Sequence, residues 1–457
     1  MRTTYWLERA WLGPPANGGT GAADALRSGV EVTVDADRIT GVEVGVARPE
    51  RGASRLAGLT IPGLANCHSH AFHRALRGRT QQGRGTFWTW REQMYGVAAK
   101  LDPDLYYGLA RATYREMVAT GITAVGEFHY LHHGPDGRPY DDPNAMGLSL
   151  IEAARDAGLR IALLDTCYLT SGIGSPPEGV QRRYTDGDVL AWQQRVDDLS
   201  SAAGAGGDGD VVVGAAIHSV RAVPRKQMGL VATWAQGRKA PLHVHVSEQV
   251  AENDDCLAAY GLTPTAVLAE EGTLGARTSV VHATHLTSGD IGLLGGSGTH
   301  ACFCPTTERD LGDGIGPSLR LHQARSSLTL GSDSHAVIDM FEEMRAVEMH
   351  ERLATRQRGH WQARHLLSAA TSQGHRSLGF ADAGRIATGA RADLVTVDTS
   401  SPRTAGTGSD ASTVVFAATS ADVVSVVSGG RIVYTRGNDQ DIGGSLGRAI
   451  ERVWEAT

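Results

Sequence analysis

Short segments near both ends of the chain alternate apolar and polar residues with a period of two, as strands with one buried face do. They cover residues 31–35 and 41–46 at one end, and residues 392–398 and 423–434 at the other. Gly429 and Gly430 interrupt the last segment and are typical of a β-hairpin turn. Because no long helical pattern accompanies the first segments, we predict a small β-sandwich domain built from both termini, residues 1–61 and 383–457.

The middle of the chain, residues 62–382, alternates apolar strands with helical segments. One helix is marked by Asp102 as its N-cap, Pro103 at its first position and Gly121 as its stop. Predicted strands begin near residues 59, 122, 160, 211, 242, 279, 299 and 327. Eight strand-helix units over about 320 residues predict an α/β fold, a TIM-type (β/α)8 barrel.

Composition narrows the class of protein. The chain has 457 residues, 41% of them apolar and 20% charged, which is typical of a globular enzyme. Its net charge of −7 is spread without long runs, so we expect neither nucleic acid nor an anionic membrane as a partner. Residues 1–9 lack the apolar core of a signal peptide, and no apolar run is long enough to span a membrane.

The cysteines indicate a reducing compartment. Their number is odd and they are scattered, so we expect buried, reduced thiols in a cytoplasmic protein. Cys302 and Cys304 form a Cys-x-Cys pair that could suggest a metal site. Their apolar strand context favours core packing instead.

Histidines and one aspartate stand where predicted barrel strands end. His68 and His70 form a His-x-His pair, whose side chains point to the same side of an extended strand. His245 ends the fifth strand, His282 the sixth, and Asp333 follows the eighth. Barrel active sites lie at this end of the strands, so these side chains are expected to meet.

His68, His70, His245 and Asp333 together would supply three imidazole nitrogens and one carboxylate oxygen. A catalytic metal needs such a set with one position left for water. Any one of these residues alone would be read as a buried histidine or a helix-capping aspartate, and the agreement of the strand ends favours a metal. We expect one divalent ion per chain, zinc with ferrous iron as the alternative. Two-metal barrels often use a carboxylated lysine at strand four, and no lysine stands there.

Glu248 lies three residues beyond His245 and is expected close to the metal. A carboxylate in this place suits proton transfer from the attacking water to a leaving nitrogen. The alternative is a solvated glutamate at a helix start. His282 and Asp333 are further catalytic candidates, able to take the first proton of the water. His243, His285 and His335 are interpreted as supporting or packing residues.

The chain resembles the amidohydrolase superfamily in its mononuclear deaminase branch. This resemblance rests on the order His-x-His, His-x-x-Glu, His, Asp on a barrel flanked by a β domain. More narrowly, four segments resemble the family of N-formimidoyl-L-glutamate deiminases of histidine degradation, namely residues 87–92, 126–133, 218–222 and 304–308. The resemblance covers essentially the whole chain. It implies a homodimer and a small dicarboxylate substrate.

The resemblance also implies substrate contacts by Arg91, Tyr130, His218 and Arg221. Each arginine can form a bidentate pair with one carboxylate of formimidoylglutamate. Alternatively, Arg91 could stack on its aromatic neighbours, and Tyr130 could belong to the core. One departure is visible: where family members carry a glutamine near the formimino nitrogen, this chain has His73. A histidine can donate or accept a hydrogen bond in that place.

Two other functions remain open at this point. A related deaminase acting on a guanine- or adenosine-type ring would need aromatic stacking surfaces in its pocket. An inactive barrel serving as a scaffold would have lost metal ligands, whereas this chain keeps all four and Glu248.

Overall fold

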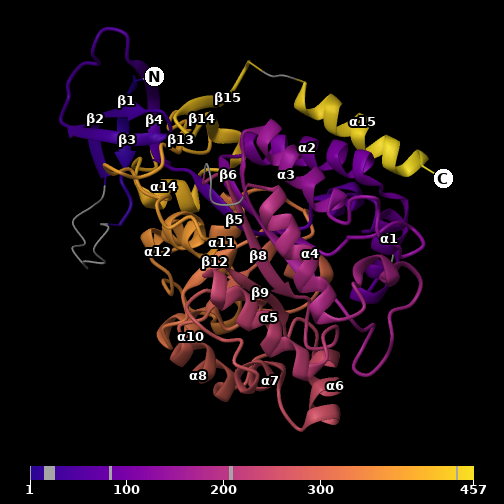
Figure 1. The fold of residues 1–457 in the computed structure, drawn as a ribbon. Helices are drawn as coiled ribbons and strands as arrows, with labels where there is room; N and C mark the ends of the chain where they lie inside the picture. The colour runs from indigo at the N-terminus through magenta and orange to yellow at the C-terminus, as the bar shows by residue number, and fades with distance from the viewer. Residues whose placement is uncertain (1, 15–25, 82–84, 205–208, 439–440, 457) are drawn as a thin grey trace.

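The computed structural model describes residues 2–14, 26–81, 85–204, 209–438 and 441–456. Two separate sheets organise them, one of eight strands in the middle of the chain and one of seven strands from both ends (Figure 1). The predicted fold class, a TIM-type barrel with a β unit contributed by both termini, is confirmed.

The barrel strands neighbour one another in chain order, and all pair in parallel. They are β5 (Leu64–Ser69), β6 (Ile122–His129), β7 (Arg160–Cys167), β8 (Val211–Ile217), β9 (Leu242–Val246), β10 (Thr278–His282), β11 (His300–Phe303) and β12 (Leu328–Leu330). The first and last of them meet just beyond β12, where Ser69 and Asp333 form a parallel bridge. Almost every residue of these strands is buried, as expected for a parallel sheet covered by helices.

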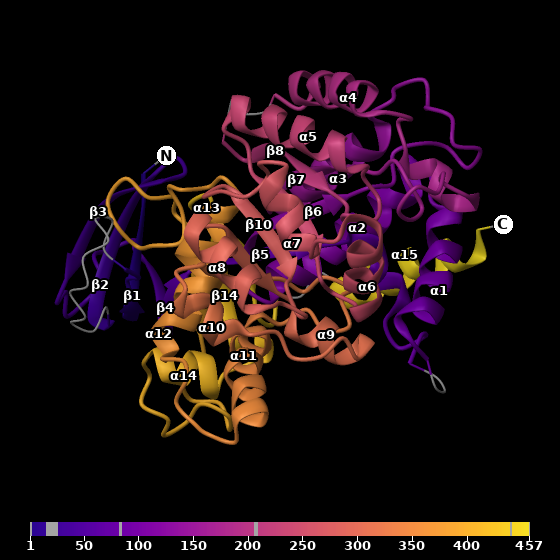
Figure 2. The same cartoon turned by 90° about the horizontal axis from the view of Figure 1, so that it is seen from below.

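Helices and short helical turns connect the strands and surround the barrel (Figure 2). The segments up to β8 are η1 (Ala71–Leu76), α1 (Phe87–Lys100), α2 (Pro103–Ala119), α3 (Ala145–Ala157), η2 (Gly179–Tyr184) and α4 (Val189–Ala202). After β8 follow α5 (Arg225–Arg238), α6 (Val250–Tyr260), α7 (Pro264–Glu270), α8 (Ser288–Ser297), α9 (Pro305–Leu311), α10 (Ser318–Gln323), α11 (Met340–Thr355), α12 (Ala363–Ser368), η3 (Ala369–Gln373) and α13 (Gly374–Ser377).

Helix α2 begins and ends as predicted. The Asp102 side chain accepts a hydrogen bond from the backbone N–H of Leu105 at 2.8 Å, and Pro103 occupies the first helical position. The helix ends before Gly121, whose φ of 96° lies in the region that favours glycine.

The seven-stranded sheet has the order β15-β14-β13-β4-β1-β2-β3. Its strands are β1 (Arg2–Trp11), β2 (Leu26–Asp35), β3 (Arg38–Val44), β4 (Ser54–Pro62), β13 (Leu394–Val397), β14 (Val423–Ser428) and β15 (Arg431–Thr435). Strand β13 pairs with β4, which joins the two chain ends into one sheet, and Gly429 and Gly430 turn the predicted hairpin. The sheet encloses its own apolar core, formed by residues such as Leu7, Val32 and Leu394.

Two details differ from the sequence prediction. The strand predicted before His68 divides at Gly63: residues up to Pro62 belong to β4 of the terminal sheet, and the barrel begins with β5 at Leu64. The C-terminal tail also contains helices that its strand pattern did not indicate, namely α14 (Ala411–Phe416), η4 (Ser420–Asp422) and α15 (Ile442–Glu455). Helix α15 packs on α1 and α2 of the barrel (Figures 1 and 2), where its apolar side is covered.

All five cysteines are buried and free, as predicted. Cys302 and Cys304 belong to an apolar cluster inside the barrel, together with Ala65 and Val281. Among the helices of the described residues, none is long and apolar enough to cross a membrane.

Candidate active site

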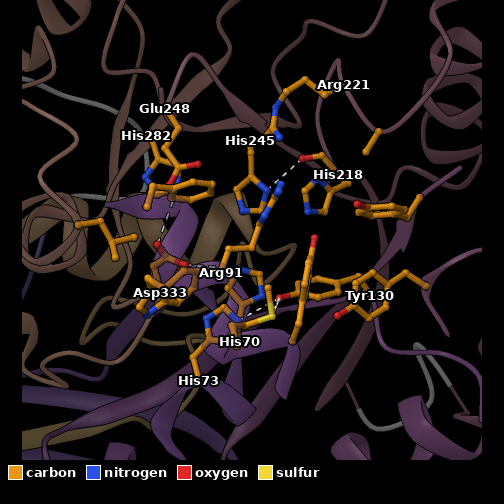
Figure 3. Close-up of a pocket in the computed structure, with 18 of the residues that line it drawn as sticks. His70, His73, Arg91, Tyr130, His218, Arg221, His245, Glu248, His282 and Asp333 are labelled. Carbon is orange, nitrogen blue, oxygen red and sulfur yellow. Dashed lines mark hydrogen bonds and ion pairs between the residues drawn. The ribbon is translucent and has the colours of Figure 1, made fainter. Parts of the chain in front are cut away.

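A cavity of about 700 Å³ opens at the C-terminal ends of the barrel strands (Figure 3). Its lining includes ten of the eleven residues that the sequence singled out for the site, namely His70, His73, Arg91, Tyr130, His218, Arg221, His245, Glu248, His282 and Asp333. His68 lies directly beneath, fully buried. The barrel therefore brings together side chains that are up to 265 positions apart, from His68 to Asp333.

The four predicted metal ligands lie at one point of the cavity floor. The Nε2 atoms of His68 and His70 each lie 3.4 Å from Oδ1 of Asp333. The Nε2 atom of His245 lies 3.0 Å from Nε2 of His68. This arrangement of nitrogen and oxygen donors is of the size that encloses a metal ion.

Hydrogen bonds select the tautomers that a metal requires. The Nδ1 atom of His70 lies 2.9 Å from the carbonyl oxygen of Phe128, and Nδ1 of His245 lies 3.0 Å from that of His218. A carbonyl oxygen can only accept, so each Nδ1 carries the proton and each Nε2 presents a lone pair. These lone pairs belong to a group of donor atoms close enough to share one cation, so the donor set fits a divalent metal.

The electrostatics of the four ligands agree with this assignment. Burial lowers the pKa of His70 to about 3 and that of His245 well below its usual value, which keeps both imidazoles neutral. Burial alone would raise the pKa of Asp333, but the hydrogen bond and charge of His68 outweigh it and lower this pKa. The Asp333 carboxylate is therefore charged, while His70 and His245 are neutral.

The ligands come so close because the first and last barrel strands nearly touch. A Cβ atom on Gly331 would lie 2.7 Å from Cβ of His68, so only glycine permits this approach. Asp333 and His282 also have positive φ angles, 42° and 68°. Non-glycine residues in this conformation are strained and gather at functional sites.

A group of acids surrounds His282 beside the metal ligands. Its Nε2 atom lies 3.8 Å from both Oε1 of Glu248 and Oδ2 of Asp333, and its Nδ1 lies 3.6 Å from Oε1 of Glu308. Burial opposes the charge on His282, but these carboxylates raise its pKa well above the usual value. Burial raises the pKa of Glu248 to about 7, a value suited to accepting and returning a proton.

The predicted substrate contacts line the rest of the cavity. Nε2 of His73 and the hydroxyl of Tyr130 lie 3.0 Å apart, so both side chains are hydrogen-bonded to each other at the cavity wall. The Arg91 guanidinium stacks on the Trp88 ring at 4.4 Å and on the Tyr95 ring at 5.5 Å. Arg91 therefore stacks on aromatic rings, as the alternative interpretation predicted, and it also lines the cavity. His218 lies at the end of β8, 4.7 Å from the Tyr168 ring.

Several residues of the site were not predicted from the sequence. Glu252 lies in the first turn of α6, and its Oε2 atom is 3.8 Å from Nε of Arg221. Asp313 lies near Glu248 and His282. Glu308 stands in a segment that carried the resemblance, but its pairing with His282 was not expected. No period or spacing marks these three carboxylates, because each contacts a partner from another strand-helix unit.

The other histidines have structural surroundings. His335 lies within hydrogen-bond distance of the Ser332 and Ser69 hydroxyls behind the metal ligands, as interpreted from the sequence. The histidines that neighbour Tyr130 in the segment 126–133 are absent from the cavity lining. His133 instead pairs with Asp186, and Arg195 forms an ion pair with the same carboxylate. This buried network fixes the loop before α4.

Comparison with known proteins agrees with this geometry. Residues 59–433 match the amidohydrolase family. The formimidoylglutamate deiminase of Pseudomonas aeruginosa is 38% identical over 374 residues, which are 79% of this chain and 81% of that protein. The solved amidohydrolase from Brucella melitensis is 29% identical with a TM-score of 0.88, covering 99% of this chain and 100% of that chain.

A more distant solved structure has the same fold. The adenosine deaminase from Xanthomonas campestris with bound zinc is 24% identical with a TM-score of 0.83, covering 99% of this chain and 98% of that chain. Since the family match covers the whole barrel and extends into the terminal sheet, the chain belongs to the amidohydrolase family.

Proposed function

We propose that the protein hydrolyses N-formimidoyl-L-glutamate to N-formyl-L-glutamate and ammonia, a step of histidine degradation. The observation that carries this proposal is the pairing, in one cavity, of a hydrolytic metal-ligand set with two arginines. The 38% identity to the deiminase of Pseudomonas aeruginosa supports the same substrate. The reaction replaces the C=N bond of the formimidoyl group by C=O, with water as the second substrate.

His68, His70, His245 and Asp333 would hold one divalent ion, zinc or ferrous iron. When bound, such an ion acts as a Lewis acid that lowers the pKa of a water molecule. The three lysines of the chain lie on or directly after helices α1 and α5, away from the ligands, which favours one ion over a lysine-bridged pair.

Glu248 is the proton carrier in this proposal. Its carboxylate takes a proton from the attacking water and delivers it to the formimidoyl nitrogen as the C–O bond forms. The remaining hydroxyl proton of the adduct then follows the same route, so the C–N bond breaks with ammonia as the leaving group and the C=O bond forms. His282 and Asp333 flank the same point and orient the water toward the formimidoyl carbon. Because Glu248 returns the proton that it accepts, each turnover leaves its charge unchanged.

Arg91 and Arg221 bind the two carboxylates of the glutamate part. Among the described residues, Arg91 makes no ion pair with an acid, so its charge is available to a substrate. Tyr130, His218 and His73 add single hydrogen bonds. His73 has the place of a family glutamine, and its contact with Tyr130 holds it beside the formimino end.

A ring deaminase is the second candidate, because aromatic side chains such as Phe87, Trp90 and Tyr168 also line the cavity. The 5-methylthioadenosine/S-adenosylhomocysteine deaminase of Pelotomaculum thermopropionicum is 27% identical over 84% of this chain. Two cavity arginines have no evident use in binding an uncharged purine, so the dicarboxylate is favoured.

Ammonia release from a small panel tests the proposal. The purified metal-loaded protein is assayed with formimidoylglutamate, formimidoylaspartate, guanine, cytosine and adenosine. We expect the highest kcat/KM for formimidoylglutamate. Faster release from any of the three ring compounds would overturn the proposed substrate.

We further propose a cytoplasmic homodimer. The buried free thiols fit a reducing compartment, and the resemblance to the deiminase family supports the dimer. Light scattering of the purified protein is expected to give twice the mass of one chain, 48.3 kDa. A monomer at micromolar concentration would contradict it.

A further inference from the structure

A glutamine outside the predicted site holds two tyrosines of the cavity. Gln181, in the turn η2, is 6% exposed, and its Oε1 atom accepts a hydrogen bond from the backbone N–H of Glu178 at 3.1 Å. A backbone N–H can only donate, which fixes the orientation of the Gln181 amide. Its Nε2 atom therefore donates, to the Tyr95 hydroxyl at 3.1 Å and to the Tyr168 hydroxyl at 2.9 Å.

Both phenol oxygens thus act as acceptors toward Gln181, and each retains its own O–H proton. Within the part of the chain that the structure describes, neither hydroxyl donates to a protein acceptor. Tyr168 is 5% exposed, and both tyrosines line the cavity, so their protons are directed toward bound molecules. A buried O–H donor without an acceptor, as at Tyr168, is costly, which points to an acceptor in the functional complex.

The charges around the tyrosines identify that acceptor. The Arg91 guanidinium lies 5.5 Å from the Tyr95 ring centre. Burial raises the pKa of Tyr168, and the nearby positive charges of Arg221 and Arg91 act against this rise. The carboxylates among the described lining residues, Glu248 and Asp333, belong to the metal end of the cavity. Among the described lining residues, the charged groups near the tyrosines are therefore arginines, and they lie beside O–H donors, a combination that suits a carboxylate.

We propose that Tyr95 and Tyr168, oriented by Gln181, donate hydrogen bonds to one substrate carboxylate bound by Arg91. This inference rests on the proposed function and specifies how that substrate is selected. The two hydroxyls come from α1 and from the segment after β7, so the Gln181 bridge sets their spacing and excludes a group that cannot accept from both. Gln181 itself is a positioning residue, since it acts through the tyrosines.

Tyr95→Phe and Tyr168→Phe test the donors, because each removes one hydroxyl and keeps the ring. The substrates are formimidoylglutamate and two analogues that each lack one carboxylate, N-formimidoyl-4-aminobutyrate and N-formimidoyl-2-aminobutyrate. We expect kcat/KM for formimidoylglutamate to fall about tenfold or more in each variant, mainly through KM. The loss should persist with the analogue that keeps the carboxylate bound by the tyrosines and disappear with the analogue that lacks it. The metal content should stay unchanged.

Gln181→Glu and Gln181→Met test the orientation. A glutamate in this position keeps the acceptor for the Glu178 N–H, but it captures the tyrosine protons and repels a carboxylate. Methionine leaves the hydroxyls free to turn toward the substrate. We therefore expect Gln181→Glu to lower kcat/KM for formimidoylglutamate at least about tenfold more than Gln181→Met does.

The outcomes separate this inference from the proposed function. A parent protein that does not hydrolyse formimidoylglutamate would refute the proposed function. If the parent hydrolyses it, equal losses on all three substrates in the tyrosine variants would overturn the inference alone. Equal activities of the two Gln181 variants would likewise overturn it.

Discussion

Replacing Arg221 by methionine tests the substrate most directly. Methionine keeps an unbranched side chain of similar reach and removes the charge. The Arg221 side chain is only 13% exposed, so its pair with a carboxylate is poorly screened by water. Losing one charge-assisted pair in such a place costs ~2–5 kcal/mol. Since each 1.4 kcal/mol is a factor of about ten, kcat/KM should drop by at least ~30-fold.

The buried carboxylate of Glu252 supplies the necessary control. It lies 3.8 Å from the Arg221 guanidinium and is nearly inaccessible to water. Burial raises its pKa, and the charge of Arg221 opposes this, so in Arg221→Met the Glu252 carboxyl takes up a proton more readily. The double variant Arg221→Met/Glu252→Gln removes this titration. It should have the same activity as Arg221→Met if the loss comes from the substrate contact.

The assay is ammonia release with formimidoylglutamate and with the two analogues that lack one carboxylate each. The loss in Arg221→Met should be large for formimidoylglutamate and small for the analogue without the carboxylate that Arg221 binds. Metal content should equal that of the parent. Equal losses on all three compounds would mean that Arg221 is structural, and the reasoning from paired arginines to a dicarboxylate would be refuted.

Four further results are expected. Elemental analysis should find about one divalent ion per chain. His245→Ala should release this ion, because the three remaining donors no longer enclose it. Two ions per chain, or full activity without any ion, would contradict the single-ion assignment. Glu248→Gln should lower kcat ~10²-fold or more with metal retained, since an amide cannot carry the proton. Burial raises the pKa of Glu248 to about 7, and only the deprotonated carboxylate accepts a proton. In the parent protein, kcat/KM should therefore fall as the pH decreases below about 7. A parent profile that stays flat between pH 5 and 8 would argue against Glu248 as the base. Asp102→Ala should lower the free energy of unfolding by about 1 kcal/mol, measured in urea, without changing kcat, because it removes only the cap of α2.

The barrel could be predicted because its signals are local. Each parallel strand is a short apolar run, and each intervening helix has its own start and stop, as Asp102 and Gly121 illustrate for α2. The meeting of the proposed metal ligands at one place could be predicted for a related reason. In a parallel barrel all C-terminal strand ends meet at one face, so placing a histidine at a strand end already places it in the site.

The division of the first predicted strand was decided by the tertiary structure. Residues 59–64 form one apolar run in the sequence, but β4 pairs with β1 and β13, while β5 pairs with β6. A period of two describes both strands equally well, so the pattern cannot tell which sheet a residue joins. The helix α15 was missed among neighbouring strand signals, and its place depends on the surfaces of α1 and α2.

The partners of the functional side chains were also decided only by the tertiary structure. The strand-end position of His282 and the family resemblance for Arg221 indicate that both side chains belong to the site. Their contacts with Glu252 and Glu308, however, join different strand-helix units. The same holds for Gln181, whose amide bridges tyrosines from helix α1 and from the segment after β7. Periodicity determines which side of an element a residue faces, whereas the distance between residues from different loops depends on how those loops pack over the barrel.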